Sequence, residues 1–262
     1  MADTGQILRF SIVGATVAGL YVLTYTALLA AGMERIWQLC PVYRNAEGSA
    51  THSPEFRMLE WYRARAGYTD LMDDCEEMIA AIARTCGTED LVRGERRAAA
   101  CMPFRRLRVA DAFLEYCGHN LTATVAENPS APPVGPLLDC AARLGVRTAQ
   151  DDSFDDVFFR LMDDRIEPNL GDGVPCLLYD YPVSMAALSR PKPEDPLWAE
   201  RVELYVCGVE LANGFGELTD AAEQRRRFEA DMAIKERLYG HRYPIDEDFI
   251  AAVAAMPPAA GM

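Results

Sequence analysis

The sequence predicts an α+β fold in which helices pack around an antiparallel β-sheet. Two segments with alternating apolar residues, 34–45 and 56–64, flank a turn-rich stretch and are typical of an antiparallel hairpin. The later strands and helices lack a regular βαβ rhythm, which disfavours a parallel sheet. The chain has 262 residues, of which 50% are hydrophobic and 25% charged. This length and composition are those of a folded protein with a substantial core.

The amino-terminal segment, residues 1–32, differs from the rest of the chain. No charged residue occurs between Ser11 and Gly32, and about 20 apolar residues suffice for a membrane helix. Residues 11–32 are therefore a candidate transmembrane helix. Ser, Thr and Tyr interrupt the apolar run, so a buried strand and helix of a soluble core is the alternative. We expect residues 33–262 to form the folded core.

The middle of the chain, from residue 69 to residue 166, is predicted to be mainly helical. Residues 69–87 have acidic residues in the first turn and a terminating glycine, Gly87. The predicted apolar face of this helix consists of Leu71, Cys75, Met78, Ile79 and Ile82. Further helices are expected at 109–117, 136–144 and 154–166, with a loop over 128–136.

The last third of the chain should contain two strands and two helices. Residues 174–183 and 200–214 each read as one strand. Asp220 and Glu223 form a capping pair for a helix over 222–238. The final helix should begin near Asp246 and end before two prolines.

Charge and cysteine usage limit the classes of function. The net charge of −14 disfavours broad nucleic-acid binding, because phosphates attract an excess of Lys and Arg. The 8 cysteines show no CxxC pair or zinc-like spacing, so we interpret them as reduced thiols of a cytoplasmic protein. With only 3 histidines, a multi-histidine metal site is not expected.

One group of chemically interesting residues lies on the predicted hairpin. Arg44 stands at its base, and Phe56 lies on the returning strand. An arginine can pair with a phosphate, and an aromatic ring can stack on a base, so the hairpin could hold a nucleotide. The alternative is an ordinary hairpin with a solvated arginine and a core phenylalanine.

A second group lies in the segment VELYVCGVELANGFGEL. Glu203 has apolar strand neighbours, and an acid in such surroundings is costly unless it meets a cation or another partner. Glu203 and Glu210 are an odd number of residues apart, so a bulge near Gly208 is needed to bring them to one face. Mg²⁺ is the natural candidate ligand. A strand with one solvated face would explain Glu203 but not the residues from Asn213 to Glu217.

Three sequence segments resemble one known family. RNAEGSATHSPEFRMLEWYRA resembles motif 2 of class II aminoacyl-tRNA synthetases, and GVELANGFGELTDAAEQRRRFEAD resembles the matching strand and helix of their lysyl branch. Together with DDVFFRLMDDRIEPNLG, they resemble the lysyl-tRNA-synthetase-like ligases that modify elongation factor P. The resemblance begins at about Leu28 and implies a class II antiparallel sheet flanked by helices.

The resemblance implies roles for individual residues. Arg44 should contact the ATP α-phosphate and the lysine carboxylate, as the catalytic residue. The implied ATP-binding residues are Arg44, Glu47, His52 and Phe56. Glu203 and Glu210 should hold Mg²⁺. The implied lysine pocket consists of Glu60, Tyr62, Asn213, Phe215 and Glu217, with Glu217 nearest to the ε-ammonium group.

The implied reaction is ATP-dependent activation of lysine or (R)-β-lysine, followed by transfer to a lysine of elongation factor P. The chain has no room for an anticodon-binding domain, and Ala212 stands where tRNA synthetases usually have glycine. Both features favour the protein-modifying branch over a lysyl-tRNA synthetase fragment, which remains an alternative.

Departures from the family pattern predict a core that is incomplete at both ends and impaired in catalysis. The motif 1 helix and strand are not found before Leu28, and the motif 3 arginine would follow Met262. Tyr25-Thr26-Ala27-Leu28 stands where the family has Thr-Ser-Pro-Glu. The family implies a homodimer, whereas the lack of motif 1 argues against one. A catalytically inactive, membrane-tethered ligand-binding remnant is the other alternative.

Overall fold

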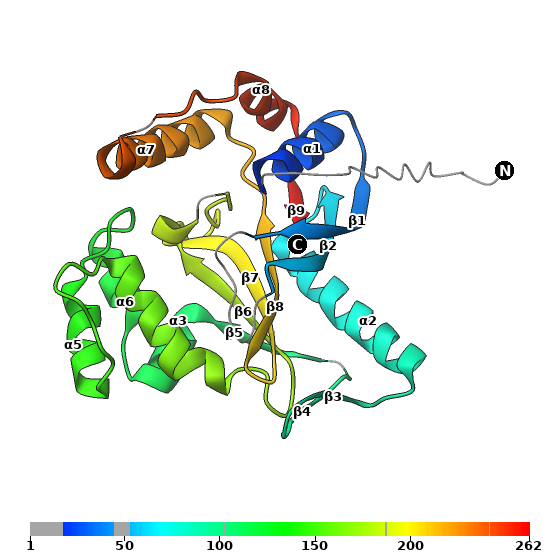
Figure 1. The fold of residues 1–262 in the computed structure, drawn as a ribbon, viewed down its shortest axis with the longest axis vertical. Coiled ribbons are helices and arrows are strands. Elements are labelled where there is room, and N and C mark those ends of the chain that lie inside the picture. The colour runs from blue at the N-terminus through cyan, green and yellow to red at the C-terminus, as the bar shows by residue number, and fades with distance from the viewer. Residues whose placement is uncertain (1–17, 45–52, 102, 187, 241) are drawn as a thin grey trace. The chain divides into compact units, whose positions relative to one another are not determined.

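The computed structural model describes residues 18–44, 53–101, 103–186, 188–240 and 242–262. The chain forms two compact units. The first contains the residues up to Arg65 together with Thr219–Gly261, and the second contains Ala66–Leu218 with Met262. Each unit is built from its own helices and strands, labelled in Figure 1.

The first unit is organised around the predicted hairpin. Strands β1 (Arg35–Tyr43) and β2 (Glu55–Ala64) pair antiparallel along their whole length. The prediction of a hairpin here is confirmed. A short third strand, β9 (Ala259–Gly261), pairs antiparallel with the end of β2 and was not predicted.

The described part of the hydrophobic amino-terminal segment forms helix α1 (Ala18–Ala30). Tyr25 and Leu29 are buried within the first unit, and Leu29 packs with Met256 and Ala259. Of the candidate membrane span, residues 11–17 lie outside the described residues. Within the part of the chain that the structure describes, no helix is long and apolar enough to cross a bilayer.

Two capped helices complete the first unit. Asp220 accepts hydrogen bonds from the backbone of Ala222 and Glu223 and so caps α7 (Ala221–Tyr239). The Glu223 side chain, expected to complete a capping pair, instead accepts hydrogen bonds from two arginines of its own helix, Arg226 and Arg227. Asp246 caps α8 (Glu247–Ala255) in the predicted place.

The sheet strands of the second unit lie in the order β5-β6-β7-β8. Their bounds are β5 (Arg105–Arg108), β6 (Cys176–Pro182), β7 (Trp198–Val206) and β8 (Val209–Gly216). β6, β7 and β8 pair antiparallel, as expected, whereas β5 pairs parallel with β6. A separate hairpin, β3 (Asp90–Arg93) with β4 (Arg96–Ala99), was not predicted.

The single strand predicted over 200–214 was wrong, because the chain reverses in its middle. Val206 pairs with Val209, so Cys207 and Gly208 form a two-residue turn. Their φ angles are 52° and 72°, and positive φ at both central residues is the mark of a tight hairpin turn. Only Gly208 signals this turn in the sequence, since cysteine rarely adopts such a conformation.

Helix α2 (Tyr68–Cys86) ends at Gly87, as predicted. Leu71 and Cys75 of its predicted apolar face are fully buried, but Ile82 is 50% exposed because it lies in the last turns. The helices predicted over 109–117, 136–144 and 154–166 are present, and two of them change from α- to π-helix before they end. The short helices over 121–127, 167–169 and 183–185 were not predicted. The bounds of these helices are α3 (Val109–Ala112), η1 (Phe113–Cys117), α4 (Leu121–Glu127), α5 (Gly135–Leu144), α6 (Phe154–Leu161), η2 (Met162–Ile166), η3 (Glu167–Asn169) and η4 (Val183–Met185).

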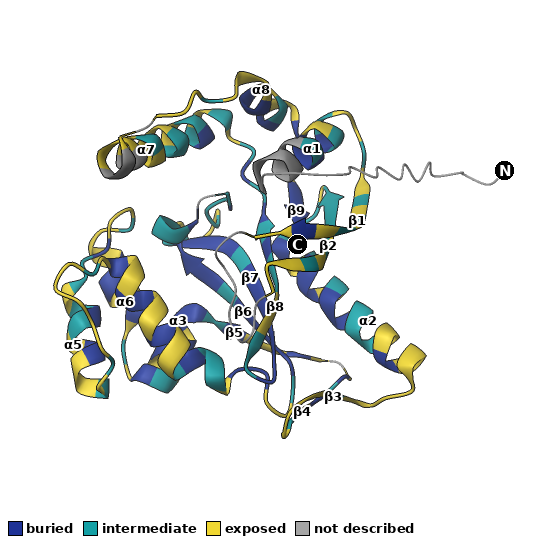
Figure 2. Ribbon diagram, in the orientation of Figure 1, coloured by how far each residue is buried: buried dark blue, intermediate teal, exposed yellow. Residues whose placement is uncertain are grey.

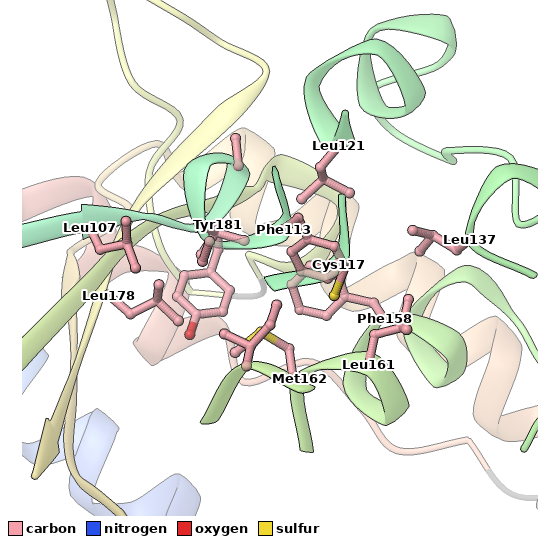
Figure 3. Packing of buried hydrophobic residues seen from close by; sticks show 14 of the residues in the cluster. Leu107, Phe113, Cys117, Leu121, Leu137, Phe158, Leu161, Met162, Leu178 and Tyr181 are labelled. Atoms are coloured by element: carbon pink, nitrogen blue, oxygen red, sulfur yellow. The ribbon is translucent and has the colours of Figure 1, made fainter. Parts of the chain in front are cut away.

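The core of the second unit lies between these helices and the sheet. Phe113 and Phe158 stack with ring centroids 4.8 Å apart, and Tyr181 of β6 packs beside them (Figure 3). Strands β6 and β7 are almost entirely buried, whereas α5 and α6 show alternating buried and exposed stripes (Figure 2). This sheet holds the β7–β8 hairpin, which carries Glu203, Glu210, Asn213 and Phe215 of the predicted site.

Candidate active site

The predicted site residues divide between the two units. Arg44, Phe56, Glu60 and Tyr62 belong to the first unit, and the residues from Glu203 to Glu217 belong to the second. Glu47 and His52 lie outside the described residues. In each group, alternate side chains of a hairpin strand point to one face.

In the first unit, Phe56, Glu60 and Tyr62 share one face of β2. Alternate residues of a strand point to the same side, and these three are half-buried while Glu55, Arg57 and Leu59 between them are exposed. Arg44 directly follows β1, and its backbone N–H donates to the Pro54 carbonyl at 2.9 Å. Its guanidinium lies 5.3 Å from the centre of the Phe56 ring. The structure therefore brings the predicted phosphate-binding and base-stacking residues together.

Glu60 has an acceptor oxygen that the protein leaves open. Its Oε2 is buried and has no hydrogen-bond partner among the residues that the structure describes. Burial raises the pKa of Glu60, while Tyr25 and the positive charge of Arg44 lower it. A buried carboxylate oxygen without a donor is costly, so Glu60 is suited to a cationic or hydrogen-bonding ligand.

Tyr25 contacts the predicted site residues, and the sequence did not indicate this contact. Its ring stacks on Tyr62 with centroids 4.3 Å apart, and its hydroxyl donates to Gln38 at 2.9 Å. Tyr25 lies within a long apolar segment, and nothing in that segment's pattern indicates this contact. Tyr25 thus supports both predicted lysine-binding residues of β2, Glu60 and Tyr62.

In the second unit, one face of the β7–β8 hairpin collects the predicted residues. Glu203 pairs with Asn213 in the strand register, and Arg201 pairs with Phe215. The bulge predicted near Gly208 exists, but it lies at Leu211, where the register shifts. The Asn213 amide donates to Glu203 at 2.9 Å and to Glu210 at 3.4 Å. The bulge thus brings the two carboxylates to one amide group.

Glu203 is the most highly coordinated side chain of this face. Oε1 accepts from Arg201 at 2.6 Å and from Asn213 at 2.9 Å. Oε2 accepts from the hydroxyls of Tyr181 and Tyr205. Because four donors already fill this carboxylate, a metal ion can bind it only by displacing one of them.

Arg201 is the missed partner that explains the buried acid. Its guanidinium lies 4.3 Å from the centre of the Tyr181 ring and 5.9 Å from that of Phe215. The arginine is held between two aromatic faces, which favour a cation. Arg201 and Glu203 are two residues apart on one strand and therefore point to the same face, a pattern that could have suggested this pair.

Glu210 and Asn213 each have an oxygen that could bind a ligand. Burial and the nearby Glu203 charge raise the pKa of Glu210 to about 7. Asn213 Oδ1 is buried and lacks a hydrogen-bond partner within the described residues. A carboxylate and an amide oxygen suit a hard cation. No group of three or more His, Cys, Asp or Glu side chains in the described part of the chain is placed to hold a metal alone.

Glu217 lies beyond the end of β8 and forms a bridge with Ser189. Burial raises the pKa of its carboxyl group to about 8, although the charge of Arg190 opposes this shift. A bound cation would favour the ionised form. Glu217 is therefore suited to bind a positively charged ligand.

Comparisons with known proteins identify a family and several similar chains. A family model described as tRNA synthetases class II (D, K and N) matches residues 23–262. The elongation factor P–(R)-β-lysine ligase of Histophilus somni is 34% identical over 236 residues, which cover 90% of this chain and 66% of that protein. The corresponding ligase of Vibrio cholerae is 36% identical over 238 residues, with coverage of 90% and 66%.

A lysine–tRNA ligase is similar to the same degree. The enzyme of Moorella thermoacetica is 35% identical over 237 residues, which cover 90% of this chain and 47% of that protein. The chain therefore spans 66% of the length of the first ligases and a smaller part of the tRNA ligase.

Proposed function

Because this chain belongs to the class II tRNA synthetases of the aspartate, lysine and asparagine group, we propose that it activates lysine or (R)-β-lysine with ATP. The acyl group then passes to a lysine side chain of elongation factor P. The observation that carries this proposal is the β7–β8 face, where Glu217 and Asn213 offer acceptor oxygens to a cationic amino acid. The names of relatives in two branches, both lysine ligases, support the amino acid.

The first step joins the amino acid to AMP. An oxygen of the amino acid carboxylate attacks the α-phosphorus of ATP, and the bond from that phosphorus to the β-phosphate bridging oxygen breaks. Pyrophosphate leaves, and an aminoacyl-adenylate remains. Arg44 would neutralise the charge on the α-phosphate, while Phe56 beside it would stack on the adenine. The reaction depends on positioning more than on a general base.

The remaining residues bind the amino acid and the cation. Glu60 Oε2 would accept a hydrogen bond from the amino acid, and Glu217 would meet its side-chain ammonium. Glu47 and His52 are proposed to lie near the triphosphate. Glu203 and Glu210 would hold Mg²⁺, which neutralises phosphate charge when bound. Glu210 fits this role directly. Glu203 fits it only if its Oε1 atom gives up the hydrogen bond from Arg201 and binds the metal ion instead.

In the second step, the amine of the acceptor attacks the adenylate carbonyl, and AMP leaves. We place this reaction in the cytoplasm, since all eight cysteines are free thiols. Incubation with ATP, (R)-β-lysine and elongation factor P should increase the mass of the factor by one lysyl residue. Transfer to tRNA instead would identify the lysine–tRNA ligase branch. Transfer to neither acceptor, with adenylate formed, would contradict the proposed acceptor alone.

A further inference from the structure

The chain has very few of the amino groups that the proposed reaction acylates. It contains 26 basic residues, and only Lys192 and Lys235 are lysines, which leaves 24 arginines. A guanidinium stays protonated at physiological pH, so it has no lone pair that could attack an adenylate. A lysine ε-amino group can attack after it loses a proton. The two lysines are therefore the only side chains of this protein with which an aminoacyl-adenylate could form an amide.

Lys192 lies beside the start of β7, and its backbone is fixed there. Its N–H donates to the Trp198 carbonyl at 2.8 Å, and the preceding residue, Pro191, forms a β-bridge with Ala199. The following residue is also a proline, Pro193, and proline rings restrict rotation of the backbone. The main chain therefore has little freedom to carry the Lys192 side chain outward.

The Lys192 ammonium group is buried in an ion pair with Asp180. Nζ lies 2.7 Å from Asp180 Oδ2, and the two side chains are only 13% and 1% exposed. Glu194 Oε1 lies 3.7 Å from the same Nζ, and the centre of the Tyr68 ring lies 6.0 Å from it. To attack a carbonyl carbon, Nζ would have to lose a proton and leave the Asp180 carboxylate.

Asp180 is itself held in place by other parts of the second unit. The Tyr68 hydroxyl of α2 donates to Asp180 Oδ1 at 2.7 Å, and Arg108 Nε of β5 donates to Oδ2 at 3.1 Å. Asp180 also has a φ of 63°, a left-handed conformation that few residues other than glycine adopt. Because this carboxylate is fixed, it cannot follow Lys192 to the surface, and separation of the buried pair is costly.

We propose that the ion pair with Asp180 shields Lys192 from acylation, so that this amine does not consume the aminoacyl-adenylate. This inference rests on the proposed function, because the adenylate is the acylating agent. In the reaction that the pair prevents, the Nζ lone pair attacks the adenylate carbonyl carbon and forms an amide bond. The bond from that carbon to the phosphate oxygen breaks, AMP leaves with the electron pair, and Nζ releases a proton to solvent. With Lys192 shielded, the acyl group remains available for an exposed lysine of the acceptor protein.

The test compares Lys192 with a lysine introduced at an exposed position of the same chain. Lys235→Arg removes the second lysine, and Arg57→Lys adds an exposed one on β2, on the side of the strand opposite to Phe56 and Glu60. The double variant is incubated with ATP, Mg²⁺ and lysine or (R)-β-lysine, without an acceptor, and its peptides are analysed by mass spectrometry. Lys192 should gain a lysyl residue at least about tenfold more slowly than position 57, because a buried amine reacts only after local opening.

A second comparison tests the role of the carboxylate. In the same background, Asp180→Asn should speed the acylation of Lys192 about tenfold, because an amide lacks the charge that holds the ammonium group. The rate at position 57 should not change, which separates this effect from a change in the supply of adenylate. If Asp180→Asn fails to fold, as judged by thermal unfolding, the comparison of the two positions in the double variant decides alone.

Equal acylation of the two positions in the folded chain would overturn the inference, and so would an unchanged Lys192 rate in a folded Asp180→Asn variant. The N-hydroxysuccinimide ester of acetic acid, which acylates amines without any enzyme, should acylate position 57 before Lys192. A chain that forms no adenylate would leave both positions unmodified in the presence of ATP and refute the proposed function, whereas the ester would still test the shielding of Lys192.

Discussion

Arg201 and Glu203 lie two positions apart on β7, and their side chains meet at 2.6 Å on the face that carries the candidate site. The arginine side chain is 15% exposed and the glutamate 5%. The pair therefore has little access to water, and its two charges depend on each other.

Glu203→Gln should destabilise the protein strongly. It leaves the Arg201 charge buried and unpaired, a change that costs about 3 kcal/mol in the free energy of unfolding. Urea unfolding at neutral pH measures this cost. Glu210→Gln on the same hairpin is the matched control and should cost no stability, because the Glu210 carboxylate accepts one long hydrogen bond, from Asn213 at 3.4 Å, and is repelled by Glu203. Equal effects of the two changes would refute the assigned pairing.

Gly171→Ala should damage the turn that connects β7 and β8. Gly171 has a φ of 71°, and a Cβ atom there would lie 2.4 Å from the Tyr205 carbonyl oxygen. We expect a loss of about 3 kcal/mol in the free energy of unfolding, from the clash together with the unfavourable φ. Gly87 has a similar φ of 66°, but no atom lies within 4 Å of a Cβ added there. Gly87→Ala should therefore lower the free energy of unfolding by about 1 kcal/mol. A smaller loss for Gly171→Ala than for Gly87→Ala would contradict this packing.

Glu217 should make stability depend on pH. Its pKa is raised from the model-compound value of 4.5 to about 8 by burial, so the folded chain retains a proton that the unfolded chain releases. Stability should therefore fall as the pH rises from about 4.5 to about 8. Urea unfolding across this range should show a shallower decline for Glu217→Gln than for the wild type. Parallel profiles for the two proteins would mean that Glu217 titrates normally.

Phe158→Ala should be far more damaging than Phe159→Ala. Phe158 is fully buried, whereas its neighbour is 42% exposed. The first change removes the stacking with Phe113 and should lower the free energy of unfolding by about 4 kcal/mol. The second should lower it by about 1 kcal/mol or less. Similar losses would be inconsistent with the core described for the second unit.

The hairpin and its site face were predictable because several local signals agree. Alternation assigns Phe56, Glu60 and Tyr62 to one face of a strand, and the turn-rich stretch before Phe56 fixes the pairing. The same alternation places Asn213, Phe215 and Glu217 together. Strict alternation put Glu203 and Glu210 on opposite faces, and the structure resolves this with a bulge at Leu211. The need for a bulge was predictable, but its position depends on how the strand meets its neighbour.

Other features depend on contacts between distant parts of the chain. The sequence predicts that Glu203 meets a cation or another partner, but it does not decide between a metal ion and Arg201. Ser189 lies far from Glu217 in sequence and pairs with it only because its segment bridges β7 and β8. The turn at Cys207 was missed because that residue adopts a backbone conformation that cysteine seldom takes.

Lysine-dependent exchange between ATP and pyrophosphate tests the central claim most directly, because it reports adenylate formation without any acceptor. It should be measured with α-lysine and (R)-β-lysine, and with Glu217→Ala as the control. We expect exchange that requires one of the two amino acids and that disappears in the variant. Absence of exchange with both amino acids, in a folded wild-type chain, would contradict the proposed activation reaction.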